Sequence, residues 1–257
     1  MNIFVCLKQT PARDSVIRFA DHGKRIDESG LTYELNEPDA FALEEGIRLR
    51  EENGGKVVVV SVGPERTIAV IREALAKGAD RGILIENDEP FQVDAFAIAK
   101  ALAAVLSEES PDIVLTGLQA DDLGFGQTGV ILAELLNLPH ASIVVKIVEI
   151  SDGSIRVRKE LESGWFQNID MPLPALLTIQ SGTNKPRYAT LMGIKKAKTK
   201  PVEYYSIRDL GVEPLRSQTT ENFYAPPKTK ETQFFEGSSR KAADKLAEKL
   251  KFEARIL

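Results

Sequence analysis

Cysteine and histidine are scarce in this 257-residue chain. Cys6 is the single cysteine, and His22 and His140 are the two histidines. One cysteine excludes an internal disulfide and an all-cysteine zinc or iron–sulfur site. His22 falls in a polar stretch and His140 stands beside a proline, a pattern that does not indicate a histidine metal cluster or a histidine-centred triad. We therefore expect no metal and no catalytic residues in this chain.

Long apolar runs and an excess of basic residues are also missing. No 18-residue apolar stretch occurs, and the first residues do not combine a basic region with a long apolar run. Lys and Arg number 33 against 38 Asp and Glu, giving a formal charge of −5. Nucleic-acid binding requires concentrated positive surface. We expect a soluble, cytoplasmic protein that neither inserts into a membrane nor binds nucleic acid.

The N-terminal half alternates short apolar runs with helical periodicity. We expect strands at 2–7, 56–62, 82–86 and 112–116, and helices that begin near Pro38, Arg66, Val93 and Gln127. The stretch from Gln9 to Leu35 is a polar excursion. Alternating strands and helices predict right-handed βαβ units and a mostly parallel sheet.

The pattern changes after Pro139. Runs at 142–149 and 154–160 are joined through Asp152-Gly153, a hairpin signal, and 166–169 and 175–179 have strand character. These runs predict an antiparallel edge, and residues 1–180 then form one α/β domain. Residues 181–257 are polar and punctuated by prolines, with one helix over 239–252. They form either an arm that wraps around a partner or a flexible tail.

A glycine-rich loop precedes the helix that begins near Gln127. Gly124, Gly126 and Gly129 have the spacing G-x-G-x-x-G, but they follow the fourth predicted strand rather than the first. We therefore reject a standard NAD fingerprint, and this misplaced motif weakens the alternative of an independent NAD-dependent oxidoreductase. Exposed N–H groups at the helix start would still bind a phosphate. The alternative is that these glycines only form a flexible connector.

Strand ends in a parallel sheet converge on one crevice, which here would gather Cys6, Val62-Gly63 and residues 117–119 beside the phosphate site. An adenosine fits such a crevice. Cys6 is better explained as a small packed side chain than as a nucleophile. Asp121 and Asp122 either bind a ribose or shape the loop.

Residues 185–200 carry six basic residues and no acidic one, with apolar residues between them. One interpretation is a solvated linker. The other is a docking surface for an acidic protein, on which charge speeds encounter and apolar side chains provide contact area.

Several motifs together resemble the beta subunit of electron transfer flavoproteins. They are Asn36 with Ala42-Leu43-Glu44-Glu45, Ser61-Val62-Gly63-Pro64, the run from Ala74 to Gly82, Gln119-Ala120, Gln127-Thr128-Gly129, and Asn184 to Leu191. They occur in order across nearly the whole chain. This family has a Rossmann-like fold of the adenine nucleotide α-hydrolase-like type.

The resemblance implies a heterodimer with an alpha subunit that carries FAD, and AMP bound in this chain. The AMP contacts fall on Cys6, Asn36, Val62, Gly63, Ala120, Gly126, Gln127 and Thr128. It also implies that Leu191 anchors a loop gripping partner dehydrogenases, and that the C-terminal arm embraces the alpha chain. The docking residues are then Arg187, Tyr188, Leu191, Met192, Ile194, Lys195, Lys196 and Lys198.

The implied function is electron transfer without a catalytic site in this chain. Electrons from acyl-CoA-type dehydrogenases, as in fatty acid oxidation, pass through the flavin to a membrane quinone oxidoreductase. Asn36-Glu37-Pro38 departs from the Asn-Pro-Phe turn of many members. Gln127-Thr128-Gly129 resembles the AMP-holding type. The alternative is the beta subunit of an electron-bifurcating member, in which a second FAD occupies the AMP site. An ATP-binding regulatory or stress-type module is the alternative of another class.

Overall fold

The computed structural model describes residues 1–87, 94–151, 153–212, 217–227 and 232–256. Its main strands are β1 (Asn2–Leu7), β6 (Lys56–Gly63), β7 (Arg81–Glu86), β8 (Ile113–Gly117), β9 (His140–Ser151), β10 (Ser154–Glu160), β11 (Phe166–Pro172), β12 (Ala175–Ile179) and β13 (Val202–Ser206). Its α-helices are α1 (Glu37–Asn53), α2 (Ile68–Lys77), α3 (Ala95–Glu109), α4 (Thr128–Leu135), α5 (Leu191–Ala197) and α6 (Ser239–Phe252).

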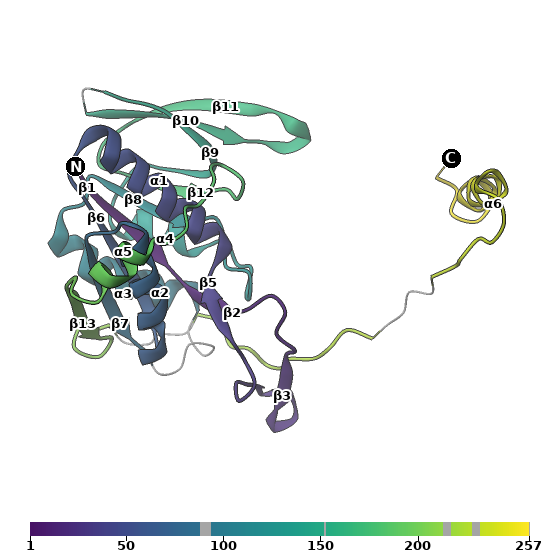
Figure 1. Ribbon diagram of the computed structural model, residues 1–257, viewed down its shortest axis with the longest axis horizontal. Helices are drawn as coiled ribbons and strands as arrows, with labels where there is room; N and C mark the ends of the chain where they lie inside the picture. Colours follow the sequence, from purple (N-terminus) through teal and green to yellow (C-terminus); the bar gives the residue numbers. More distant parts are fainter. Residues whose placement is uncertain (88–93, 152, 213–216, 228–231, 257) are drawn as a thin grey trace. The chain divides into compact units, whose positions relative to one another are not determined.

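The nine strands form one sheet in the order β11-β10-β9-β12-β8-β1-β6-β7-β13 (Figure 1). All neighbours from β9 to β13 in that order pair in parallel, whereas β10 pairs antiparallel with both β9 and β11. This confirms the predicted Rossmann-like α/β class with an antiparallel edge. The hairpin joining β9 and β10 lies where it was predicted, although Asp152 is outside the described residues.

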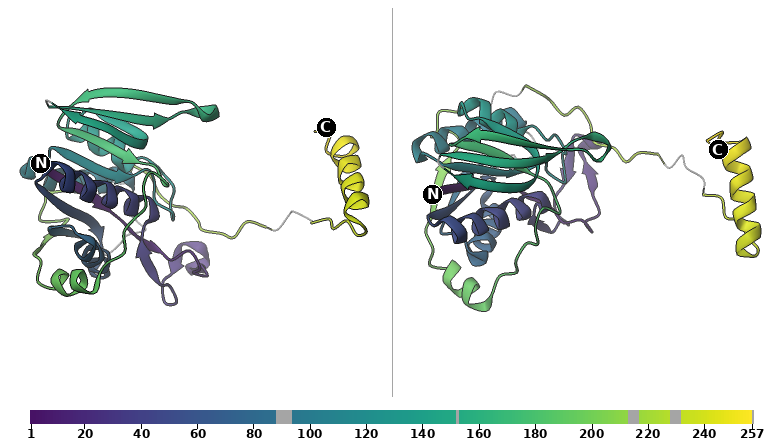
Figure 2. Two further views of the ribbon diagram at one scale, coloured as in Figure 1. Left: turned by 45° about the horizontal axis from the view of Figure 1, so that its top comes forward. Right: turned by 90° about the horizontal axis from the view of Figure 1, so that it is seen from above.

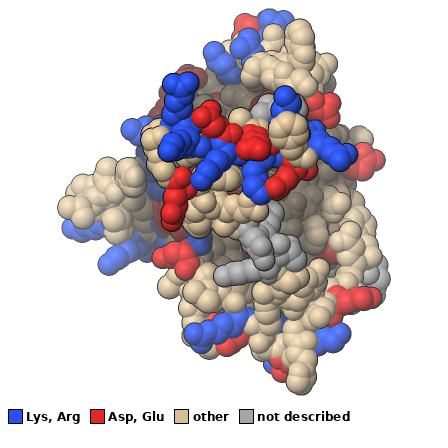
Figure 3. All heavy atoms as spheres, turned by 90° about the vertical axis from the view of Figure 1, so that its right-hand side faces the viewer, with Lys and Arg blue, Asp and Glu red and all other residues tan. Residues whose placement is uncertain are grey.

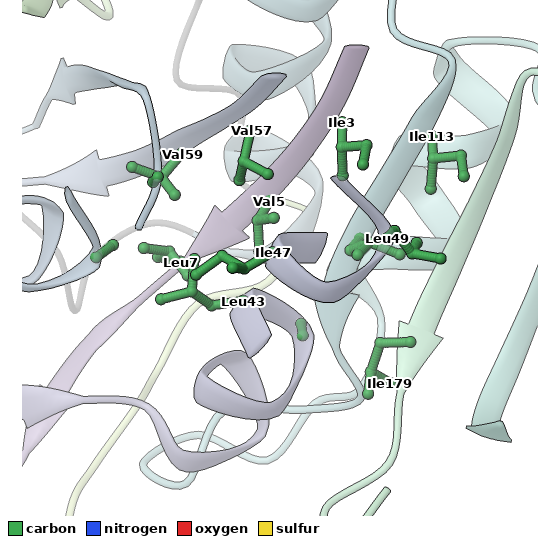
Figure 4. Packing of buried hydrophobic residues seen from close by; sticks show 14 of the residues in the cluster. Ile3, Val5, Leu7, Leu43, Ile47, Leu49, Val57, Val59, Ile113 and Ile179 are labelled. Carbon is green, nitrogen blue, oxygen red and sulfur yellow. The ribbon is translucent and has the colours of Figure 1, made fainter. Parts of the chain in front are cut away.

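Strand alternation sends side chains to two separate cores. Ile3, Val5 and Leu7 of β1 pack beneath α1 (Figure 4). Residues of α2 and α5 belong to the same core. Phe4 and Cys6 of the same strand point to the opposite face, where α3 and α4 cover the sheet. Successive side chains of a strand alternate between faces, so a strand buried on both faces must be apolar throughout. The valines of β6 meet this requirement, because Val57 to Val60 are all fully buried.

The antiparallel edge is apolar on one face only. Ile155 and Val157 of β10 are buried, whereas Ser154, Arg156 and Arg158 are exposed. This alternation is typical of an antiparallel ribbon with one solvated face. Figure 2 shows the ribbon of β9, β10 and β11 along one edge of the sheet.

Two strands differ from what the sequence suggested. Residues 175–179 were grouped with the antiparallel edge, but β12 lies between β8 and β9 and is parallel to both. All five of its residues are buried, as expected for an interior parallel strand. Residues 202–206 were assigned to the arm, but β13 extends the sheet beyond β7.

The polar excursion contains short strands. β2 (Gln9–Pro11) pairs with β5 (Tyr33–Leu35), and β3 (Arg18–Ala20) pairs with β4 (Arg25–Asp27). Three 3-10 turns complete the structure: η1 (Asp21–Gly23), η2 (Glu65–Thr67) and η3 (Glu162–Gly164).

The chain divides into two compact units, residues 1–223 and 224–257. The predicted boundary at residue 180 does not coincide with this division, because β13 belongs to the sheet. In the second unit, α6 has the predicted bounds, and none of its residues is buried.

No described helix is long and apolar enough to cross a membrane. Acidic and basic side chains are interspersed on the face shown in Figure 3.

Candidate functional site

The principal cavity lies at the carboxyl ends of β1, β6 and β8, beside the start of α4. The cavity and the open solvent at its mouth together span about 1130 Å³. The chain leaves β1 through α1 to reach β6 on one side, whereas β8 lies on the other side of β1. Such a reversal of strand order is where open α/β sheets bind ligands. The structure brings together here all eight residues proposed to contact the nucleotide, namely Cys6, Asn36, Val62, Gly63, Ala120, Gly126, Gln127 and Thr128.

Asn36 ties the cavity loop to the start of α1. Its Nδ2 donates to the Gln119 carbonyl at 3.1 Å, and its Oδ1 accepts from the Asp121 N–H at 2.9 Å. Its side chain is 1% exposed. Asn36 therefore holds the loop in place, and this bonding uses both ends of its amide.

Asp39, in the first turn of α1, joins the ends of two strands. Its Oδ2 accepts from the Lys8 N–H at 2.7 Å and its Oδ1 from the Gly117 N–H at 2.9 Å. A Cβ on Gly117 would stand 2.3 Å from Asp39 Oδ1. Gly117 was expected at this crevice, whereas Asp39 was not singled out from the sequence. Both residues line the cavity. Asp39 could have been recognised as an acidic residue directly after Pro38, at the start of a helix that must pack against the sheet.

Burial raises the pKa of Asp39 to about 7. Hydrogen bonds from Lys8, Asn36 and Gly117 act in the opposite direction, but the loss of hydration is the larger effect. Burial, and secondarily the charge of Asp39, also raises the pKa of the Cys6 thiol. Cys6 therefore stays a protonated thiol, which supports its interpretation as a packed side chain.

Asp39 should make stability depend on pH. The pKa of its carboxyl group is about 7 in the folded protein and about 4 in the unfolded chain. Its contribution to the free energy of unfolding is therefore complete below about pH 4, decreases as the pH rises to about 7, and stays constant above that pH. The difference in that free energy between the native chain and Asp39→Asn should shrink by on the order of 2–4 kcal/mol between about pH 4.5 and pH 7.5. Urea unfolding at several pH values measures it.

Asp94 provides the control for this measurement. Burial raises its pKa, but backbone N–H groups, including those of Ala97, Ser217 and Gln218, lower it more, so the net shift is downward. Its stabilising contribution is present above about pH 4 and is lost as the pH falls below that value. Asp94→Asn should therefore show a constant difference from the native chain over the same interval. A constant difference for Asp39→Asn would contradict the raised pKa.

The glycine loop leaves the start of α4 without a side-chain cap. Gly124 and Gly126 have φ of 65° and 62°, in the left-handed region that favours glycine. Gln127 is the N-cap residue, and its side chain makes no capping hydrogen bond. A Cβ on Gly129 would stand 2.7 Å from both Thr116 and Thr178, so this third glycine lets the helix lie close to β8 and β12. An uncapped helix start facing a cavity is suited to a phosphate.

Charged side chains around the cavity are already paired within the chain. Lys8 Nζ lies 2.6 Å from Asp122 Oδ1, and Asp122 Oδ1 also accepts from the Leu123 N–H. Asp122 therefore shapes the loop. Arg66 lies 4.1 Å from the centre of the Tyr33 ring and pairs with Glu28 at 2.9 Å. Among the described residues, no group of three or more His, Cys, Asp or Glu could hold a metal.

The second predicted set lies on α5 and on either side of it, within residues 185–200. We call these residues the docking segment, after the role predicted for them. Tyr188, Leu191, Met192 and Ile194 are 91%, 87%, 64% and 47% exposed. Lys195, Lys196 and Lys198 are also exposed. Arg187 differs from these residues, because its guanidinium pairs with Glu44 and Glu51 of α1. The segment therefore presents apolar and basic side chains together, and Arg187 is bound within the chain.

Comparisons with known proteins agree with this fold. A family model described as the electron transfer flavoprotein domain matches residues 24–210. The chain belongs to the electron transfer flavoprotein family. A subunit beta from Methylophilus methylotrophus is 42% identical over 82% of this chain and 81% of its own length. A subunit beta from Bacillus subtilis is 34% identical, and a mitochondrial subunit beta from Arabidopsis thaliana is 32% identical, each over the full length of both proteins. The beta-subunit resemblance is confirmed.

Proposed function

We propose that this chain carries AMP and works as one half of an electron transfer flavoprotein, paired with an alpha subunit that holds FAD. The observation that carries the proposal is the gathering of Cys6, Val62, Ala120 and the start of α4 around one cavity, in a chain whose relatives are electron transfer flavoprotein beta subunits. The FAD supplies the redox chemistry when it is bound. The residues of this chain bind AMP and form the surfaces that contact the partner proteins.

The cavity fits a nucleoside monophosphate. Two glycines at positive φ and an uncapped helix start provide a cradle for the phosphate, and Val62 and Cys6 provide apolar wall beside it. Asn36 and Asp39 fix the two sides of the cavity relative to each other. In this proposal AMP has a structural task.

Electrons enter from acyl-CoA-type dehydrogenases and leave to a membrane quinone oxidoreductase. The docking segment receives the dehydrogenase. Residues 224–257 act as the arm around the alpha subunit, because α6 buries none of its own residues and Phe234, Leu246 and Phe252 are exposed within that unit. This assembly is proposed to work in the cytoplasm.

The test is the nucleotide content of the two-chain complex. The chain is co-expressed with an electron transfer flavoprotein alpha chain, and the purified pair is extracted with acid. Chromatography of the extract should yield one FAD and one AMP per pair. Two FAD and no AMP would replace this function with electron bifurcation. A stable, colourless homodimer that hydrolyses ATP would instead indicate a regulatory module.

A matched pair of glycine variants tests the position of AMP. Gly124 and Gly126 have nearly equal positive φ, so alanine strains the backbone similarly at both, by about 1–2 kcal/mol. Only Gly126 lines the cavity. Gly126→Ala should reduce the AMP recovered by several-fold with FAD unchanged, whereas Gly124→Ala should retain both nucleotides. Equal AMP loss from both variants would remove the loop contact from the proposal.

A further inference from the structure

The docking segment is fastened to the domain at its N-terminal end by Arg187. The Arg187 Nε and Nη2 atoms donate to Glu44 at 2.9 and 3.0 Å, and Nη1 and Nη2 donate to Glu51 at 2.6 and 3.0 Å. The Arg187 N–H also donates to Glu44 Oε2 at 3.0 Å. Two-point pairing of a guanidinium with carboxylates fixes direction as well as distance. Arg187 therefore fixes the direction in which the docking segment runs from its contact with α1.

The residue before the segment strengthens this attachment. Asn184 Nδ2 donates to the Phe41 carbonyl and to Glu45 Oε2, both at 3.0 Å. Glu44 and Glu45 are only 6% and 7% exposed. Buried carboxylates require partners, and the start of the docking segment supplies them.

The C-terminal end is fastened to α2. Arg72 Nη1 donates to the carbonyls of Ala197 and Lys200 at 2.7 and 2.8 Å. Lys200 Nζ donates to the carbonyls of Leu75 and Ala79 at the end of α2. The segment is thus held at both ends by cationic side chains, to α1 through Arg187 and to α2 through Arg72 and Lys200.

Between these attachments, α5 lies directly on the backbone of α2. A Cβ on Gly193 would stand 2.2 Å from the Ala76 carbonyl oxygen. α5 has seven residues, too few to be stable as an isolated helix in water. Its shape therefore depends on the contacts at its ends and beneath it.

We propose that the Arg187 clamp, meaning Arg187 with Glu44 and Glu51, holds the docking segment in its binding shape before any partner arrives, with Arg72 doing the same at the other end. Both arginines are positioning residues. They hold Leu191 and the neighbouring exposed side chains in position, and these side chains contact the partner. Ordering a loop in advance lowers the entropy cost of association. This inference rests on the proposed docking of dehydrogenases.

The experiment compares Arg187→Lys with Arg156→Lys in the two-chain complex. Arg156 also makes a two-point pair with a carboxylate, that of Asp170, but on the β10–β11 hairpin. Lysine keeps the positive charge and loses the fork geometry in both variants. Arg187→Lys should raise the KM for the dehydrogenase about fivefold with kcat unchanged and nucleotide content intact, and Arg156→Lys should leave KM unchanged.

Hydrogen exchange separates positioning from direct contact. In the complex without dehydrogenase, amides of residues 188–199 should exchange at least several-fold faster in Arg187→Lys than in the native protein or in Arg156→Lys. Arg72→Lys should reproduce both effects. A native KM in Arg187→Lys overturns the inference, as does a raised KM without faster exchange, because Arg187 would then contact the partner itself.

A separate variant distinguishes this inference from the function beneath it. If Leu191→Ala leaves the rate of reduction unchanged, the docking role of the segment is lost, and with it the inference. If Leu191→Ala slows reduction and Arg187→Lys does not, only the Arg187 clamp is overturned.

Discussion

Replacing Leu191 with alanine should slow reduction of the two-chain complex by its dehydrogenase about 10- to 100-fold. Leu191 is 87% exposed at the start of α5, with Met192 beside it. A central apolar anchor in an interface contributes about 2 kcal/mol or more when it is removed, which corresponds to this range. Stopped-flow measurement of flavin reduction, at dehydrogenase concentrations below KM, gives the rate.

Leu161→Ala is the control for this substitution. Leu161 is 42% exposed and follows β10, at the edge of the sheet opposite to β13. It should react at the native rate, and both variants should retain FAD and AMP. A Leu191→Ala rate within twofold of the native rate would remove the docking segment from the mechanism.

Replacing Gly117 with alanine should damage the nucleotide cavity more than alanine at Gly124 or Gly126. The new Cβ would stand 2.3 Å from Asp39 Oδ1 and 2.8 Å from the Asp39 backbone nitrogen. A methyl group forced into packed backbone costs about 1–3 kcal/mol, and here it also displaces the carboxylate that joins β1 to β8. We expect the free energy of unfolding to fall by about 3 kcal/mol and most of the AMP to be lost.

Gly30→Ala is the matched control, because a Cβ at Gly30 meets nothing within 4 Å. It should leave both the urea midpoint and the AMP content unchanged. Retention of native AMP content by Gly117→Ala would mean that the cavity does not depend on the contact between Asp39 and Gly117.

Much of the fold could be predicted because apolar periodicity reports burial directly. The valines of β6 and the alternation along β10 each have one structural explanation. The position of β12 could not be predicted in this way. Its five apolar residues show that it is buried on both faces, but strand order is fixed by contacts between residues far apart in sequence. β13 was missed because none of its five residues is buried, and because it follows a basic stretch that ends in Pro201.

The residues that line the cavity could be predicted more completely than the residues that hold the cavity and the docking segment in place. Parallel strand ends must converge, so Cys6, Val62 and the glycine loop could be brought together from topology alone. Asp39 could not, because its importance arises from its close contact with Gly117, which the sequence pattern does not show. Arg187 looked like one cation among six, and only its distances to Glu44 and Glu51 separate it from the lysines that follow.

Helix α1 serves both regions of the chain that the proposal uses. Its first turn holds the cavity through Asp39, and its later turns hold the docking segment through Glu44 and Glu51. An α-helix turns by about 100° for each residue. Inserting or deleting a single residue between Asp39 and Glu44 would therefore rotate the glutamates away from Arg187, and it would also rotate Ile47 and Leu49 out of the core beneath α1. The spacing within α1 thus sets the contacts of the cavity, the core and the docking segment together.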